Sequence, residues 1–191
     1  TPAIVDADPQ MSIVRRHDPE GALSKLTVVS DPEADSVQAT IADLAERHQP
    51  VIVDTAGFRN QTTIMAAIVA DLVLIPLKPA SEDADEAIAM FELINELNQT
   101  PERKGRPIMA FMVMTMTTPN AVIVRHVRKE LESGGYPLLE AEIAHRVIYP
   151  ELSIRGLAPS IVDGDSAASR DIARLATEIM KKVKTHGVKA A

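Results

Sequence analysis

The sequence predicts an α/β fold, a doubly wound and mostly parallel sheet with helices on both faces. Three observations indicate this class. Short continuous apolar runs recur along the chain, as in strands that are buried on both faces of a parallel sheet. Segments with helical spacing of apolar residues alternate with these runs, as in successive βα units. Acidic residues stand at the carboxyl ends of two runs, where open α/β sheets place their ligands.

The composition limits the classes of protein that need to be considered. A chain of 191 residues fits one α/β domain, and we expect residues 1–191 to form a single domain. Cysteine is absent, which excludes disulfides and thiolate metal sites and fits a cytoplasmic protein. The net charge of −7 means that DNA binding would need a local basic patch. No apolar run reaches the ~18 residues that cross a bilayer, so we expect no stable membrane insertion.

The first half of the chain is expected to contain three strands and two helices. Asp31 and Pro32 are typical of a helix N-cap and first helical position, and the apolar spacing continues this helix to about His48. A second helix is expected over the mostly apolar residues 61–69. The expected strands are residues 3–5, 26–29 and 51–54.

The second half continues the alternation. Pro76 must lie at the end of a strand over residues 71–77, because proline cannot donate to a central ladder. Ser81 caps a helix whose first turn is acidic, as the helix dipole favours. The remaining expected segments are a strand over 108–114, a loop over 115–120, a helix over 121–133, a strand within 138–144, an irregular segment over 145–165 and a helix over 166–183.

The stretch Val-Ile-Val-Asp-Thr-Ala-Gly at residues 51–57 is the first candidate site. Asp54 follows a buried strand, where a carboxylate can hold magnesium directly or through water. Gly57 allows the backbone to approach a phosphate or to change conformation. The alternative is an acid that caps a loop.

The second candidate site is Val-Asp-Ala-Asp-Pro-Gln at residues 5–10. Asp6 and Asp8 are two residues apart, so their side chains point the same way if the strand continues through them. One carboxylate could then approach the water shell of a metal ion and the other a nucleophilic water. The alternative is a turn formed by Asp and Pro.

These segments resemble a known family in their order and spacing over almost the whole chain. Residues 5–10 resemble the second signature of the ParA/MinD class of deviant-Walker ATPases, and residues 51–57 resemble its Walker B strand and switch. Residues 71–77 are similar to the strand that follows. Residues 160–166, Ser-Ile-Val-Asp-Gly-Asp-Ser, are similar to a segment of the small plasmid partition ATPases of the ParF-like branch.

The resemblance implies a P-loop NTPase fold of the SIMIBI type, with ATP and magnesium as cofactors. It implies an ATP hydrolase that dimerises with ATP between its subunits and binds DNA non-specifically. A centromere-bound partner protein, ParB-like or ParG-like, would stimulate hydrolysis, and the cycle would move plasmids or chromosomal loci apart. Such a protein would be cytoplasmic and associated with the nucleoid.

One motif of the family has no counterpart here. The sequence contains no glycine-rich loop followed by Lys and Ser or Thr, the element whose backbone amides bind phosphates. The fold would therefore lack its first βα unit. Two explanations stay open: roughly 30–40 N-terminal residues, about one βα unit, are absent from this sequence, or the chain is a degenerate relative. The abrupt start in a strand, without Met, favours truncation.

The resemblance assigns roles to individual residues. Asp54 would place magnesium, Asp6 would support the metal shell, and Asp8 would orient the attacking water. Phosphoryl transfer needs mainly positioning and charge neutralisation, which such a small set of acids can supply. The residues expected near the nucleotide are Asp6, Pro9, Gln10, Gly57, Thr115, His145 and Arg146.

Basic residues on two expected helices are candidates for DNA contacts. If these helices met across a dimer, they could form a basic stripe along a phosphate backbone. The alternative is that each is an ordinary cation on a solvated helical face. The candidates are Arg125, Arg128, Lys129, Lys181 and Lys182.

Two other functions remain open at this stage. A MinD-like positioning ATPase would need a membrane-binding amphipathic helix, and an apolar stripe on the last helix has that spacing, although such stripes more often pack in a core. A non-catalytic dimerising relative would need no phosphate loop. The stripe consists of Ile172, Leu175, Ile179 and Val183.

Overall fold

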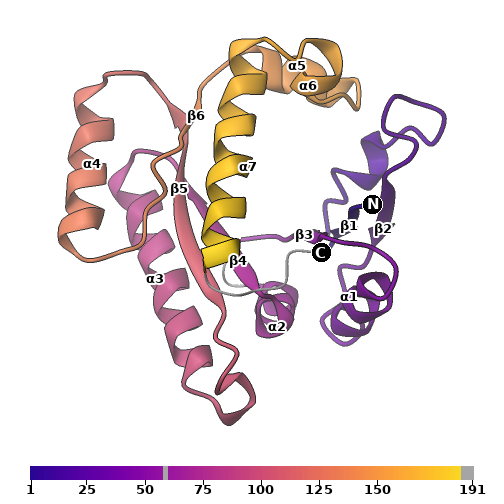
Figure 1. The fold of residues 1–191 in the computed structure, drawn as a ribbon, viewed down its shortest axis with the longest axis horizontal. Helices are drawn as coiled ribbons and strands as arrows, with labels where there is room; N and C mark the ends of the chain where they lie inside the picture. The colour runs from indigo at the N-terminus through magenta and orange to yellow at the C-terminus, as the bar shows by residue number, and fades with distance from the viewer. Residues whose placement is uncertain (58–59, 186–191) are drawn as a thin grey trace. The chain divides into compact units, whose positions relative to one another are not determined.

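The computed structural model describes residues 1–57 and 60–185 and divides the chain into two compact units. Unit 1 comprises Thr1–Ala70 and Tyr149–Val162, and unit 2 comprises Asp71–Ile148 and the chain from Asp163 onward. Each unit contains a three-stranded parallel sheet with helices packed on it (Figure 1). The predicted α/β class with parallel strands is confirmed, although the strands form two sheets where one was expected.

The sheet of unit 1 has the strand order β2-β1-β3. In-register pairing places Asp6 opposite Ser30 on one side and opposite Asp54 on the other. Within its unit β3 pairs with β1 alone, and Ile52 on this edge strand is 52% exposed. The three strands are β1 (Ala3–Asp6), β2 (Thr27–Ser30) and β3 (Val51–Asp54).

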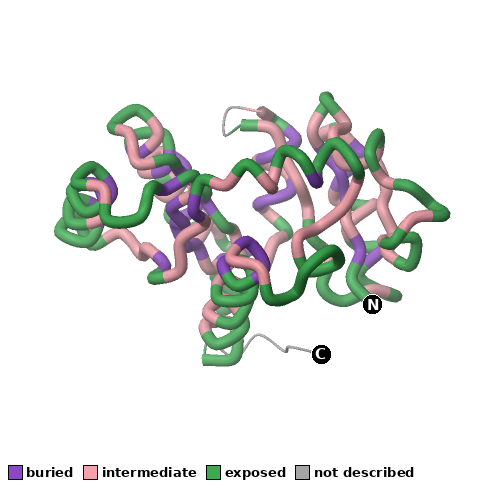
Figure 2. Tube along the Cα trace, turned by 90° about the horizontal axis from the view of Figure 1, so that it is seen from above, coloured by how far each residue is buried: buried purple, intermediate pink, exposed green. Residues whose placement is uncertain are grey.

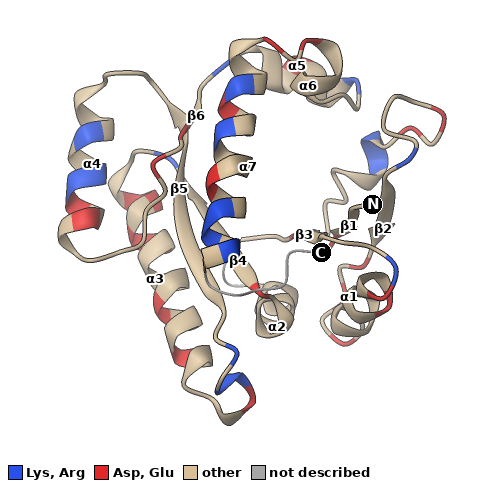
Figure 3. Ribbon diagram, viewed as in Figure 1, with Lys and Arg blue, Asp and Glu red and all other residues tan. Residues whose placement is uncertain are grey.

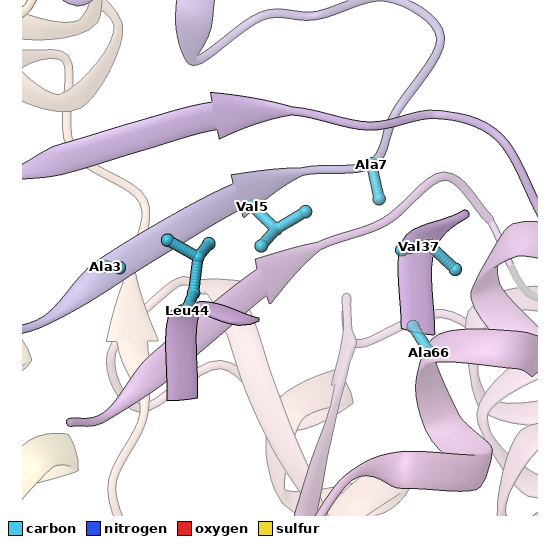
Figure 4. Packing of buried hydrophobic residues seen from close by; sticks show 6 residues of the cluster. All are labelled: Ala3, Val5, Ala7, Val37, Leu44 and Ala66. Carbon is cyan, nitrogen blue, oxygen red and sulfur yellow. The ribbon is translucent and has the colours of Figure 1, made fainter. Parts of the chain in front are cut away.

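One face of this sheet is buried under α1 (Val37–Ala45) and α2 (Gln61–Val69). Alternate residues of β1 and its continuation point to that face, because side chains alternate along a strand. They meet the buried side chains of the two helices in a small aliphatic core (Figure 4). The core residues are Ala3, Val5, Ala7, Val37, Leu44 and Ala66.

Helix α1 begins at Val37, five residues later than the position of Pro32 predicted. The reason is the buried carboxylate of Asp31, which accepts hydrogen bonds from Ser36 Oγ at 2.6 Å, from Thr40 Oγ1 at 2.5 Å and from the amide of Glu33 at 3.3 Å. Burial raises the pKa of Asp31, but these hydrogen bonds outweigh burial and hold the pKa below its ordinary value. Residues 32–36 form a turn that the side chain of Asp31 holds in place.

We expect Asp31→Ala to lower the free energy of unfolding by about 1–3 kcal/mol, because the hydroxyls of Ser36 and Thr40 lose their acceptor in a partly buried site. Urea titration monitored by circular dichroism measures this change. Asp35→Ala is the matched control, since Asp35 is exposed on the same turn and should change stability by less than about 0.5 kcal/mol. Equal effects of the two substitutions would contradict the assigned role.

The sheet of unit 2 has the order β4-β5-β6, with β5 in the centre and buried over most of its length. Figure 2 shows how buried, intermediate and exposed residues are distributed along the Cα trace. Helices α3 and α4 lie on one face of it and α7 on the other (Figure 1). On the α7 side, Phe111 and Val113 pack against Leu175 and Ile179. The elements are β4 (Leu72–Leu77), α3 (Ser81–Asn98), β5 (Met109–Thr117), α4 (Val122–Ser133), β6 (Ile143–Ala144) and α7 (Ala167–Thr185).

Several predicted boundaries differ from the structure. Strand β5 continues to Thr117, so the first part of the loop expected over 115–120 is strand. The last strand is only two residues long, with an isolated bridge at Leu138. The segment expected to be irregular contains two short helices, and two short 3-10 helices lie elsewhere in the chain. These four are α5 (Ile148–Ile154), α6 (Pro159–Val162), η1 (Val14–Arg16) and η2 (Pro101–Arg103).

Pro76 and Gly156 are constrained by their neighbours. Pro76 lies within β4, which pairs with β5 alone inside its unit, so an amide missing from the other edge costs no ladder bond. Gly156 has a φ of +63°, and a Cβ there would lie 2.2 Å from the carbonyl oxygen of Arg16.

Over the described ranges, 1–57 and 60–185, no helix is both long and apolar enough to span a membrane.

Candidate functional site

The acids at the carboxyl ends of β1 and β3 form the centre of the site. Asp6 and Asp54 are paired in register on adjacent strands. The Asp6 side chain is fully buried, and its Oδ2 accepts the amide hydrogens of Ile13 and Val14, both at 2.9 Å. Its Oδ1 is equally buried but has no hydrogen-bond partner among the described residues. A buried carboxylate oxygen left in this state is costly unless a ligand or water satisfies it.

Asp54 is half-buried beside two other acids. Burial raises its pKa, and the negative charges of Asp6 and Asp8 raise it further. A cation would relieve this repulsion, and magnesium is commonly held by one or two carboxylates with the remaining positions taken by water and phosphate oxygens. The described residues include no cluster of three or more His, Asp or Glu side chains able to hold a metal ion. The acid pair therefore fits a magnesium ion that keeps other oxygen ligands.

Asp8 forms the turn that follows β1. Its Oδ1 accepts the amide hydrogen of Gln10 at 2.8 Å, and its carbonyl accepts that of Met11 at 2.8 Å. The turn that was considered as an alternative is thus present, and one carboxylate oxygen is engaged in it. Pro9 and Gln10 are exposed beside Asp8. The hydrogen bond in the turn leaves the other oxygen of Asp8 available, and the negative charge of Asp8 acts on Asp54.

The loop after β3 is tied to α2. Thr63 Oγ1 donates to the carbonyl of Ala56 at 2.9 Å, and Asn60 caps α2 by accepting the amide hydrogen of Thr62 at 2.8 Å. A Cβ added to Gly57 would meet nothing within 4 Å, so the described chain imposes no steric need for glycine there. Any such requirement would have to come from a ligand or partner.

The other nucleotide candidates lie in unit 2, at the carboxyl ends of β5 and β6. Thr115 donates to the carbonyl of Leu77 at 3.3 Å, and the amide of His145 donates to the carbonyl of Thr117 at 2.9 Å. Between the two threonines the pairing shifts register, and Met116 is 51% exposed with a φ of +53°. A left-handed backbone at a long side chain is unusual and often marks a functional position.

The side chain of Arg146 is bound to an acid of α7. Its Nε donates to Asp171 Oδ2 at 2.8 Å, and Arg174 donates to the other oxygen of the same carboxylate at 2.6 Å. Asp171 is only 2% exposed. Sequence reasoning missed this residue, although it shares a helical face with Leu175 and Ile179, and an acid on an apolar face signals a buried partner.

The structure separates the five basic candidates by environment. Arg128 is held by Glu142 Oε1, at 2.6 Å from Nη2 and 3.2 Å from Nε, and by the carbonyl of Leu139. Lys182 lies over the ring of Phe111, 5.5 Å from its centroid. The others, Arg125, Lys129 and Lys181, are exposed. Since α4 and α7 cover opposite faces of the sheet, the two sets form no single patch within unit 2 (Figure 3).

No family model matches the sequence. The protein ParA of Rhizobium radiobacter is 29% identical over 153 residues, which cover 78% of this chain and 67% of that protein. The structure of apo McdA from Cyanothece superposes with a TM-score of 0.72 at 14% identity, over 93% of this chain and 87% of that one. MinD of Pyrococcus horikoshii with Mg-ADP gives 0.70 at 11% identity, over 98% and 86%.

The chain resembles the ParA/MinD-type ATPases, in sequence through ParA and in fold through McdA and MinD. The sequence match to ParA and the shared fold agree with the motif order at residues 5–10 and 51–57. The acids of both motifs lie on adjacent strands of one sheet. The family is one of nucleotide-binding P-loop ATPases, and its structures include complexes with Mg-ADP and with ATP.

Proposed function

We propose that this chain is part of a ParA-type ATPase that partitions plasmid or chromosomal DNA through ATP-dependent dimerisation and non-specific DNA binding. The observation that supports this most is the in-register pair Asp6 and Asp54, with an unpartnered buried oxygen on the first and a raised pKa on the second. Two acids held in this state at strand ends are suited to a magnesium-nucleotide site.

The residues would act as follows. Asp54 holds magnesium through water, Asp6 supports the metal shell, and the second oxygen of Asp8 orients the attacking water. Magnesium, when bound, neutralises phosphate charge. Pro9, Gln10 and Gly57 belong to the loops around the phosphates. The sequence has no glycine-rich phosphate loop, so these residues supply only the magnesium side of such a site.

In unit 2, we propose further nucleotide contacts at the carboxyl ends of β5 and β6. Thr115 and His145 are placed there by backbone and side-chain hydrogen bonds. Arg146 would contribute through the position of its loop, since its guanidinium is bound to Asp171.

DNA would contact the exposed cations Arg125, Lys129 and Lys181. Because α4 and α7 lie on opposite faces of unit 2, these cations form no single stripe within the unit, and we propose that a homodimer brings them together on DNA. We further propose a centromere-binding partner protein and a cytoplasmic location on the nucleoid.

The test is DNA binding by the native polypeptide, measured by fluorescence anisotropy with duplex DNA of unrelated sequences. We expect binding with ATP and Mg²⁺, weaker binding with ADP, and a steep loss with salt. The double substitution Lys129→Ala and Lys181→Ala should weaken binding to all sequences and reduce the salt slope by about 2, one for each phosphate contact. Lys104→Ala, an exposed cation elsewhere in unit 2, is the control. Binding that is independent of ATP, or absent at low salt, contradicts the proposal.

A MinD-like positioning ATPase is the second candidate. The chain shares the fold of MinD structures, and Ile172 and Met180 on α7 are 42% and 48% exposed. Leu175 and Ile179 of the same helix pack in the core of unit 2, so half of the predicted stripe is not available to bind a membrane. Co-sedimentation with anionic liposomes in the presence of ATP would favour this candidate, and calorimetry that shows no ATP binding by the native polypeptide would favour a non-catalytic relative.

A further inference from the structure

A row of three polar side chains crosses the sheet of unit 1 at the carboxyl ends of its strands. Asp6 of β1 is paired in register with Ser30 of β2 on one side and with Asp54 of β3 on the other. Paired residues share a face of the sheet, and successive residues of a strand alternate between its faces. The preceding row packs into the aliphatic core, so the polar row lies on the opposite face. That preceding row consists of Val5, Val29 and Val53.

Two oxygen atoms of the polar row are buried and unpaired within the described chain. Asp6 Oδ1 and Ser30 Oγ are both shielded from solvent, and neither has a hydrogen-bond partner in the part of the chain that the structure describes. The orientation of the Asp6 carboxylate is set by its other oxygen, since Oδ2 accepts the amide hydrogens of Ile13 and Val14, each at 2.9 Å. Buried oxygens in this state usually bind an ordered water molecule.

The place of Ser30 beside Asp6 is fixed by the backbone on both sides of it. The pairing of β2 with β1 continues past Ser30, because the amide of Asp31 donates to the carbonyl of Asp6 at 3.0 Å. The Asp31 side chain is held in turn by the hydroxyls of Ser36 and Thr40. The unpaired hydroxyl of Ser30 is therefore not the result of a loose strand end.

One water molecule suits the space between these two oxygens better than a metal ion does. Neighbouring strands lie about 4.8 Å apart, so paired side chains that do not bond directly are within reach of a single bridging water. Magnesium keeps several waters of its own in a near-octahedral shell, and such a shell would not reach an oxygen that is shielded from solvent. Asp54, which is only half-buried, is the more accessible acid for a hydrated ion.

We propose that Asp6 Oδ1 and Ser30 Oγ hold one buried water molecule between them, and that Ser30 is thereby a positioning residue for Asp6 in the magnesium site; this rests on the proposed function. The Ser30 hydroxyl donates to the water, and the water donates to Oδ1. Both oxygens of Asp6 are then bonded, one to the amides of Ile13 and Val14 and the other through the water to β2. The carboxylate keeps one orientation, with its charge beside Asp54.

The experiment titrates the native polypeptide with Mn²⁺ alone, which prefers the same oxygen ligands as Mg²⁺ and is followed by electron paramagnetic resonance. The ions bound at this site are those lost in Asp54→Asn. For Ser30→Ala we expect the affinity of this site to fall roughly 10-fold, as is typical when a group that orients a metal-binding carboxylate is removed. Ser24→Ala, the same change at an exposed serine of unit 1, is the control and should leave the affinity unchanged.

Rescue separates the hydroxyl from a general effect on the fold. Ser30→Thr keeps the hydroxyl and should bind Mn²⁺ like the wild type, whereas Ser30→Val has nearly the same shape without the hydroxyl and should be as weak as Ser30→Ala; this pair also serves if Ser30→Ala fails to fold. A crystal structure of the wild type should show a water bonded to Asp6 Oδ1 and Ser30 Oγ, and that of Ser30→Val should lack it.

The possible failures point to different conclusions. Wild-type affinity in Ser30→Ala, equal affinities in Ser30→Thr and Ser30→Val, or a wild-type crystal structure without the water would overturn the inference. If Asp54→Asn instead lost no bound Mn²⁺, the magnesium site of the proposed function would itself be wrong.

Discussion

Asp54→Asn is expected to make the fold more stable at neutral pH and to remove its response to magnesium. The carboxylate of Asp54 is half-buried beside Asp6 and Asp8, and its raised pKa shows that the folded state opposes its negative charge. Asparagine has nearly the same shape and no charge, so the substitution removes this opposition. Thermal unfolding followed by circular dichroism between pH 4 and pH 8 measures the effect.

The pH dependence has a definite direction. In the unfolded chain Asp54 titrates near an ordinary value of about 3.9, and in the folded state it titrates higher. Between these two values the folded state binds more protons, so the wild type loses stability as the pH rises through that window. At pH values above this window the wild type remains destabilised. The difference between Asp54→Asn and the wild type should therefore be small below the window and should favour the variant above it.

Magnesium and nucleotide should stabilise the wild type but not the variant. Millimolar Mg²⁺ with ATP should raise the midpoint of the native wild-type polypeptide, because a ligand that binds only the folded state stabilises it. The variant should show little of this increase, and its hydrolysis rate should fall on the order of 100-fold or more. Asp35→Asn, an exposed acid of the same unit, is the control. A variant that keeps the wild-type magnesium response would contradict the assignment of Asp54.

Gly156→Ala is expected to cost about 2–4 kcal/mol of stability. Two penalties combine at this residue: a left-handed backbone costs an L-residue about 1–2 kcal/mol, and a Cβ 2.2 Å from the carbonyl oxygen of Arg16 forces the two segments apart. Both segments belong to unit 1, so the loss falls on that unit. Urea titration measures it.

Two other glycines separate these penalties. Gly135 has a φ of +78° but open space around the added Cβ, so Gly135→Ala should show the backbone penalty alone. Gly164 has neither feature, and Gly164→Ala should be close to neutral. If Gly156→Ala and Gly135→Ala proved equally destabilising, the close approach to Arg16 would have no energetic weight.

The sequence predicted the strands of the fold better than its connections. Apolar runs that end in Asp6 and Asp54 located β1 and β3, because a strand buried in a parallel sheet depends mostly on its own residues. Helix α4 was predicted to within one residue from its apolar spacing and the glycines that follow it. The segment over 145–165 was predicted to be irregular, because its Pro and Gly residues hide the short helices α5 and α6.

Site residues whose position depends on neighbouring sequence were predictable, and contacts between distant segments were not. The positions of Asp6 and Asp54 at strand ends followed from the apolar runs before them, whereas their pairing on adjacent strands came only from the structure. The contact between Arg146 and Asp171 joins residues 25 positions apart across a helix and a loop, and no periodicity shows it. The left-handed backbone of Met116 was equally hidden, since methionine gives no sign of a positive φ.

Strands β3 and β4 each lie at one edge of their sheet, which has a consequence for the behaviour of the protein in solution. Inside its unit each of β3 and β4 has a neighbour on one side, and unpaired backbone groups on the other side are a template for strands of other molecules. Pro76 interrupts the row of donors on β4, which blunts that edge. The edge of β3 has no proline and carries the half-exposed Ile52. Of these two edges, β3 is therefore the more open to pairing with a strand of another molecule, and a charged residue in place of Ile52 is the change that would discourage it.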